Sequence, residues 1–136
     1  MQVIDPAGWK RKPLSDFFGQ LDFPFYGVTF RVDVTRMCMR AKEAGVSAYF
    51  AAIWASMRAV NGLDAFLYKL RGQTVVRHDA LNPSFVVPTE DELFKIVHVD
   101  WLPEEALADF CNRAQAVCRA QETFINEADE VRDDFV

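Results

Sequence analysis

One segment limits what this chain can fold into more than any other, and it spans residues 47–61. Its large apolar residues recur at the i, i+3, i+4, i+7 spacing of one helical face, with alanines in the turns between them: Phe50, Ile53, Trp54, Met57 and Val60. Ser47 can cap the first turn, because its hydroxyl can accept from a free helical N–H, and Gly62 follows as a stop signal. The pattern predicts a buried central helix.

The composition predicts one globular domain with a sizeable core, because 51% of the 136 residues are hydrophobic and 12 are phenylalanine. No apolar run approaches the roughly 20 residues of a membrane helix, and the first residues lack the pattern of a signal peptide, so we expect a cytoplasmic protein. The net charge of −5 argues against nucleic acid or an anionic membrane as a partner. Small molecules or further copies of the chain remain as partners.

The three cysteines have no CxxC spacing and predict reduced thiols, with Cys111 and Cys118 facing the core of a helix. His78 and His98 are the only histidines, and each falls alone on a predicted strand, where a surface or structural role is favoured over a catalytic one. No metal site is expected, because no Cys or His residues are spaced as ligands. The sequence also lacks GxGxxG, P-loop and GxSxG motifs.

Hydrophobic periodicity and turn signals divide the rest of the chain into short elements. Strands are predicted at residues 28–34, 84–87 and 93–99, and a hairpin at residues 67–81 that turns over residues 71–73. Helices are predicted at residues 35–44, with Thr35 as cap, and at residues 103–125. The chain stops on Phe135 and Val136, which read as the opening of a further strand. These elements predict an α/β or α+β domain.

Residues 14–26 are unusually aromatic, with turn-forming glycine and proline between the rings. Such a cluster is either the edge of a core or the wall of a pocket, and the sequence alone favours the core. The aromatic residues are Phe17, Phe18, Phe23, Phe25 and Tyr26.

Four stretches of the sequence together resemble the start of the chloramphenicol acetyltransferase family. They are W-x-R-K-x-x-x-x-F-F from Trp9, V-D-V-T ending at Thr35, A-V-N-x-x-D from Ala59, and N-P-S-F-V-V from Asn82. The resemblance implies an α+β two-layer α/β sandwich, with a mixed β-sheet, helices packed on one face and the C-terminal strands missing. Residues 1–136 would then form a single incomplete acetyltransferase-like domain.

The resemblance also implies a reaction, in which acetyl passes from acetyl-CoA to a hydroxyl of chloramphenicol or a similar small molecule. Acetyl-CoA is then a co-substrate, and no permanently bound cofactor is expected. In the family, a histidine of an HHxxxDG motif acts as general base, a role typically worth about 10²- to 10⁴-fold in rate. The 136 residues contain no HxxxDG. We therefore assign no catalytic residue, and we expect the chain as given, a truncated or partly recorded copy, to be inactive alone.

The resemblance places six residues of this chain on the wall that binds the acceptor: Phe17, Phe18, Tyr26, Ser84, Val86 and Phe94. Flat aromatic surfaces suit a nitrophenyl ring. Other positions depart from the family, since Asp22 replaces a leucine and Pro24 a cysteine, while Ser84 and Val86 replace a glutamine and a threonine. A carboxylate is costly in an apolar pocket unless it is paired. Arg11 matches a structural arginine whose aspartate partner lies in the absent motif, so we expect it to be exposed or bound elsewhere.

Family members are trimers whose sites lie between subunits, so the resemblance implies a homo-oligomer with exposed apolar surface and sheet edge. Two functions follow from it: an O-acetyltransferase linked to antibiotic resistance, or a non-catalytic remnant that oligomerises or binds a ligand. The dihydrolipoyl acyltransferase catalytic domains, which share the fold and the motif, are a weaker third possibility.

Overall fold

The computed structural model describes residues 1–136 and contains both helices and antiparallel strands, which confirms the α+β class. The helices are α1 (Lys12–Phe18), α2 (Thr35–Glu43), α3 (Ala48–Asn61) and α4 (Leu107–Ala120), with short 3₁₀ turns at Asp64–Leu67 and Glu127–Asp129. The strands are β1 (Gln2–Ile4), β2 (Tyr68–Arg71), β3 (Thr74–Arg77), β4 (Ser84–Pro88) and β5 (Phe94–His98).

The strands form two small sheets, one ordered β1-β3-β2 and the other a β4–β5 pair, and all of these pairings are antiparallel. The predicted hairpin is confirmed, because β2 pairs with β3 from Arg71 opposite Thr74 and leaves a two-residue turn. Gly72 occupies that turn with φ +58°, a conformation that glycine adopts without strain. Where the sequence predicts the opening of a strand at the end of the chain, the structure has a single parallel bridge, which joins Asn82 to Phe135.

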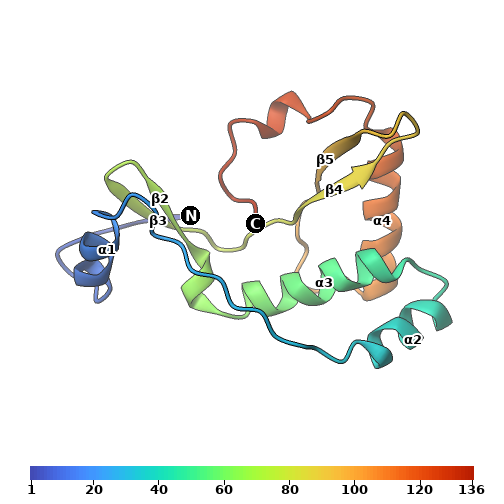
Figure 1. Cartoon of the computed structure of the whole chain (residues 1–136), viewed down its shortest axis with the longest axis horizontal. Helices are drawn as coiled ribbons and strands as arrows, with labels where there is room; N and C mark the ends of the chain where they lie inside the picture. Colours follow the sequence, from blue (N-terminus) through green and yellow to red (C-terminus); the bar gives the residue numbers. More distant parts are fainter.

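The core lies where α3 and α4 pack against one face of β4–β5 (Figure 1). The predicted central helix is confirmed: Phe50 and Met57 are buried, while the other three apolar residues of its stripe are partly buried against the same cluster. The Phe50 ring lies 5.8 Å from that of Phe85 on β4, and Trp101 lies 5.9 Å from Phe110 on α4. The Phe50–Phe85 contact therefore joins α3 to the sheet between residues distant in sequence, and the Trp101–Phe110 contact joins α4 to the loop that follows β5.

The predicted strand at residues 28–34 is wrong, because residues 22–34 form neither helix nor strand. Its alternating apolar side chains remain 46–73% exposed: Val28, Phe30, Val32 and Val34. An alternating pattern becomes a strand only when another strand satisfies its backbone N–H and C=O groups. No segment of this structure pairs with these residues.

The core interpretation of the aromatic cluster in residues 14–26 is also wrong. All five of its aromatic side chains are exposed, from 48% at Phe18 to 93% at Tyr26. Figure 1 shows why they find no core: α1 lies at one end of the molecule, and the chain then runs past α3 to reach α2 at the other end. These rings therefore form surface, which leaves the pocket-wall interpretation open.

Two helix boundaries differ from those predicted. At α2, Val34 holds the cap position instead of Thr35, and the Asp33 carboxylate accepts from the Thr35 N–H at 2.9 Å. Helix α4 is shorter than residues 103–125 at both ends. At its C-terminal end, the chain turns to bind the outer edge of β5, where the Ile96 N–H donates to the Phe124 carbonyl oxygen at 2.8 Å. Tertiary hydrogen bonds thus end α4 before its sequence pattern does.

The cysteines of α4 lie as predicted. Cys111 and Cys118 are buried free thiols, and burial raises the pKa of each. Cys38 on α2 is exposed. None of the helices is both long and apolar enough to cross a membrane.

Candidate functional site

The first part of the predicted acceptor wall lies on α1. Pro13 occupies the first turn, where its missing N–H costs no hydrogen bond, and the helix ends at Gly19. Phe17 and Phe18 meet edge to face with ring centroids 5.3 Å apart, and they are 62% and 48% exposed. Helix α1 therefore presents a pair of rings to solvent.

A groove of about 340 Å³ separates α1 from β2 and β3, and Phe18 is one of its walls. Its other large side chains are Trp9, Arg11, Leu14, Tyr68 and Leu70. Trp9 stacks on Tyr68 at 5.8 Å, and the Arg11 guanidinium lies 5.3 Å from the centroid of the same ring. Arg11 is exposed and makes no ion pair, and its guanidinium forms a cation–π contact with the Tyr68 ring.

The second part of the wall lies on β4–β5. Ser84 and Val86 are two residues apart on β4, and Phe94 pairs with Pro88 in the same alternation, so all three share one face of the sheet. The opposite face carries Phe85 and Val97, which are buried against the helices. The three predicted wall residues therefore point away from α3 and α4.

Neighbouring aromatic residues hold this second part in place. The Tyr49 hydroxyl donates to the Val86 carbonyl oxygen at 2.8 Å, and the rings of Phe94 and Phe124 lie 5.5 Å apart. Burial raises the pKa of the Tyr49 hydroxyl, which favours the protonated donor that this hydrogen bond needs. Val86 and Phe94 are about half exposed, so the face can accept a ligand ring.

The structure does not bring the two parts together. Each of the five main cavities is lined by members of at most one part. Tyr26 lies between α1 and α2 and is 93% exposed. Asp22 is exposed as well, so its carboxylate stays hydrated here and the cost of burying it does not arise.

Comparison with known proteins identifies the family to which the chain belongs. The family model described as "CAT: Chloramphenicol acetyltransferase" matches residues 1–131. The chain belongs to the chloramphenicol acetyltransferase family. A solved structure titled "chloramphenicol acetyltransferase" superposes with a TM-score of 0.80 at 24% identity, covering 95% of this chain and 60% of that one. The chain therefore spans about three fifths of that relative's length and shares its fold. A comparison with curated protein sequences found no match.

In this acetyltransferase family member, the acidic C-terminal segment is held by a network that sequence reasoning missed. The Arg132 guanidinium binds the carboxylates of Asp100, Asp129 and Asp134 at 3.0–3.2 Å, and it lies 4.4 Å from the Phe135 ring centroid. Its hydrogen bond keeps the pKa of Asp134 below the usual value. The only sign of this network in the sequence is Arg132, a single arginine within a run of acidic residues.

Both histidines join the body of the protein to the same C-terminal segment. The Nε2 atom of His78 lies 3.4 Å from Asp133, and the Nδ1 atom of His98 lies 3.4 Å from Asp129. Both side chains are 8% exposed, and His98 stacks on Phe135 at 3.8 Å. Both histidines therefore pack between the strands and the C-terminal segment. No group of three or more His, Cys, Asp or Glu residues is placed to hold a metal ion.

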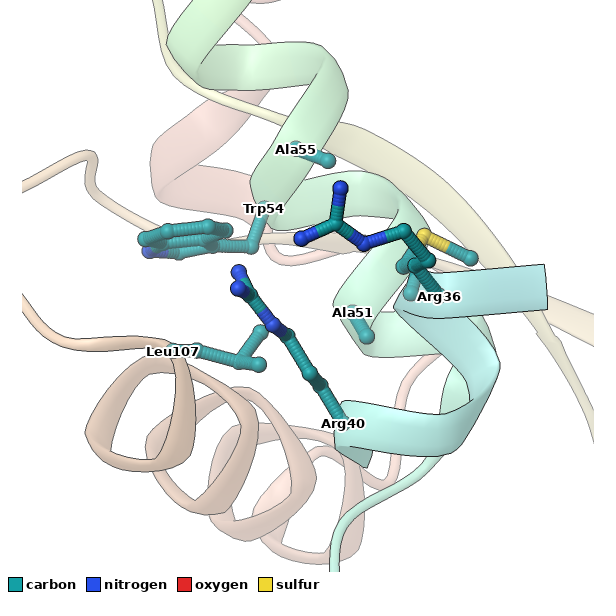
Figure 2. A pocket seen from close by; sticks show the side chains of 7 residues that line it. Arg36, Arg40, Ala51, Trp54, Ala55 and Leu107 are labelled. Atoms are coloured by element: carbon teal, nitrogen blue, oxygen red, sulfur yellow. The ribbon is translucent and has the colours of Figure 1, made fainter. Parts of the chain in front are cut away.

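A second cavity that the sequence did not reveal lies between α2, α3 and the start of α4 (Figure 2). It measures about 460 Å³, and five of its seven lining residues are hydrophobic. The other two are Arg36 and Arg40, spaced one helical turn apart on α2. None of the six predicted wall residues contributes to it.

Proposed function

We propose that this chain supplies the acceptor-binding side of a CoA-dependent O-acetyltransferase, which passes acetyl from acetyl-CoA to a hydroxyl of chloramphenicol or a similar small molecule. Family membership supports the reaction class. The observation that carries the proposal is the shared outward face of Ser84, Val86 and Phe94, because it pairs one hydroxyl with apolar and aromatic surface that remains accessible. An acceptor that combines hydroxyl groups with an aromatic ring matches that face.

Each wall residue has a separate role in this proposal. Phe94 stacks on the acceptor ring and Val86 packs beside it, while the Ser84 hydroxyl hydrogen-bonds a polar substituent. Phe17, Phe18 and Tyr26 supply the opposite wall. Since the two parts lie apart in one chain, we propose that they face one site only in a homo-oligomer, a trimer in the family, in which subunits complete each other's sites.

A second function, an oligomerising or ligand-binding module without catalysis, is favoured by one observation. None of the first forty residues is buried, although this region carries most of the predicted aromatic wall. A surface of this kind can bind a ligand or a second chain without performing chemistry.

Calorimetric titration with chloramphenicol, combined with an assay for thiol released from acetyl-CoA, tests these functions. Release of thiol that depends on chloramphenicol supports the enzyme and contradicts the module. Binding without thiol release is the result that we expect of the chain as given, and it supports an acceptor-binding surface in either function. Absence of both results contradicts the two proposals together. The variant Phe17→Ala/Phe18→Ala should weaken binding at least tenfold, whereas Phe23→Ala/Phe25→Ala, an exposed ring pair outside the proposed wall, should leave it unchanged.

A further inference from the structure

The second cavity, which lies between α2, α3 and the start of α4 and which we call the α2–α3 pocket, has small side chains on α3 opposite long side chains on α2. Ala51 and Ala55 are one turn apart on α3 and form a low floor, while Trp54 and Leu107 form apolar walls. From α2, Arg36 and Arg40 extend over this floor, and Figure 2 shows both guanidinium groups directed towards the Trp54 ring. The pocket thus has an apolar base and a positively charged rim.

Neither rim arginine has an acidic partner. The ion pairs and side-chain hydrogen bonds of the structure involve other cations. Helix α2 has no acidic residue in its first turn, and the Asp33 carboxylate that precedes it accepts from the Thr35 N–H and forms no ion pair with Arg36. Arg36 itself lies near the positive end of the helix dipole, which disfavours a cation. Like charges one turn apart on a helix repel each other. An anion bound between the two side chains would remove these unfavourable interactions.

The walls are held by contacts that leave the rim free. The Trp54 indole N–H donates to the Glu105 carbonyl oxygen at 3.1 Å, which fixes the ring. The Glu105 carboxylate binds Arg113 through two hydrogen bonds, so it does not neutralise the rim. Arg58 does not line the pocket, but its guanidinium lies 4.9 Å from the Trp54 ring centroid. The lining therefore carries two arginines and no acidic residue, on a chain whose net charge is −5.

We propose that this pocket binds a phosphate monoester whose organic part is aromatic or aliphatic. Two guanidinium groups match the charge of a phosphate dianion and offer more N–H donors than the two oxygens of a carboxylate can use. The apolar floor and the Trp54 face accept the organic part, and about 460 Å³ lies within the range of small-molecule sites. This proposal is independent of the proposed acceptor wall, which shares no residue with the pocket.

Phenyl phosphate is the probe, titrated into the full chain at low salt by calorimetry and followed by ³¹P NMR. We expect phenyl phosphate to bind at least tenfold more tightly than benzoate, phenol or inorganic phosphate. Comparable binding of benzoate would overturn the preference for phosphate. Comparable binding of inorganic phosphate would overturn the role of the apolar floor, and comparable binding of phenol would overturn that of the arginines.

Variants then locate the site. Arg36→Gln and Arg40→Gln should each weaken phenyl phosphate binding, and together at least tenfold. The control for each single variant is Arg31→Gln, which removes one exposed arginine outside the pocket and should not change binding. Ala55→Leu fills the floor without altering charge and should also weaken binding. Circular dichroism and the urea midpoint establish that each variant is folded. Unchanged binding in the double arginine variant, or an equal loss in Arg31→Gln, would contradict the proposal.

Discussion

The first forty residues and the rest of the chain use similar residue types to opposite effect. Residues 1–40 contain no buried side chain, although phenylalanine and valine are frequent among them. From Ala41 onward, fourteen buried residues form one connected core. The difference shows that apolar content does not by itself bury a segment, because burial also requires a complementary surface within reach.

The largest expected effect compares one phenylalanine from each region. Phe110 on α4 is fully buried, so Phe110→Ala should lower the free energy of unfolding by about 3–5 kcal/mol through lost burial and the cavity left behind. Phe30 is 73% exposed, so Phe30→Ala should change it by less than about 0.5 kcal/mol. Urea denaturation measures both. Equal losses in the two variants would abolish the distinction between the regions.

A smaller effect is expected at Asn82, which joins the body to the C-terminal segment. Its side chain accepts from the buried Trp101 N–H at 2.7 Å and donates to Asp134 at 3.0 Å. Asn82→Ala leaves the Trp101 N–H without a partner and should cost about 1–3 kcal/mol in urea denaturation. The control Asn112→Ala removes an exposed amide on α4 and should be nearly neutral. A neutral Asn82→Ala would show that this junction does not stabilise the fold.

Self-association should depend on the exposed segment of the first region. Val28, Phe30 and Val32 alternate with polar residues and can present one apolar face to a second chain. Phe30→Lys should raise the dissociation constant of self-association about tenfold, roughly 1.4 kcal/mol, while Arg31→Lys should leave it unchanged. Sedimentation velocity over a concentration series measures the constant. A chain that stays monomeric at every concentration would contradict this prediction.

The smallest expected effect is the pH response of the C-terminal segment. Hydrogen bonds from Arg71 and Arg132 hold the pKa values of Asp133 and Asp134 below the usual value. Because these pKa values are lowered in the folded state, the associated stability is present above the ordinary aspartate pKa of about 3.9 and is lost as the pH falls through the lower folded values.

Hydrogen exchange of the Val136 N–H, which donates to the Asn82 carbonyl oxygen at 2.9 Å, reports on this segment. Its protection should fall below about pH 4, before that of amides within α4. Arg132→Gln should reduce the protection already at neutral pH. Simultaneous loss of protection in the C-terminal segment and in α4 would show that the segment does not open independently of the helix.

Sequence reasoning succeeded where the pattern within one segment was enough to define its structure. Residues 47–61 carry a complete helical stripe, and residues 67–81 contain their own turn, so both elements were predictable. The order of short motifs around Trp9, Asn61 and Asn82 identified the family that the family model then confirmed. In each case, neighbouring residues held most of the necessary information.

It failed where the outcome depended on a partner distant in sequence. Residues 28–34 have the alternation of a strand but nothing to pair with, and α4 ends early because Gln121 bonds β5, its side-chain amide donating to the Ile96 carbonyl oxygen at 2.8 Å. The α2–α3 pocket was missed because Arg36 and Arg40 line a cavity only where α2 packs opposite Ala51 and Ala55 of α3. Such relations between segments are a property of tertiary packing.

The central proposal is that Phe17 and Phe18 of one subunit and Val86 and Phe94 of another line one acceptor-binding site. NMR of the methyl and ring resonances during titration with chloramphenicol tests it most directly. We predict that signals of all four residues shift with a common midpoint, while those of Val131, which is 89% exposed in the C-terminal segment, stay in place. Absence of shifts at α1 and β4–β5, or shifts confined to Met37 and Leu107 in the α2–α3 pocket, would contradict the account.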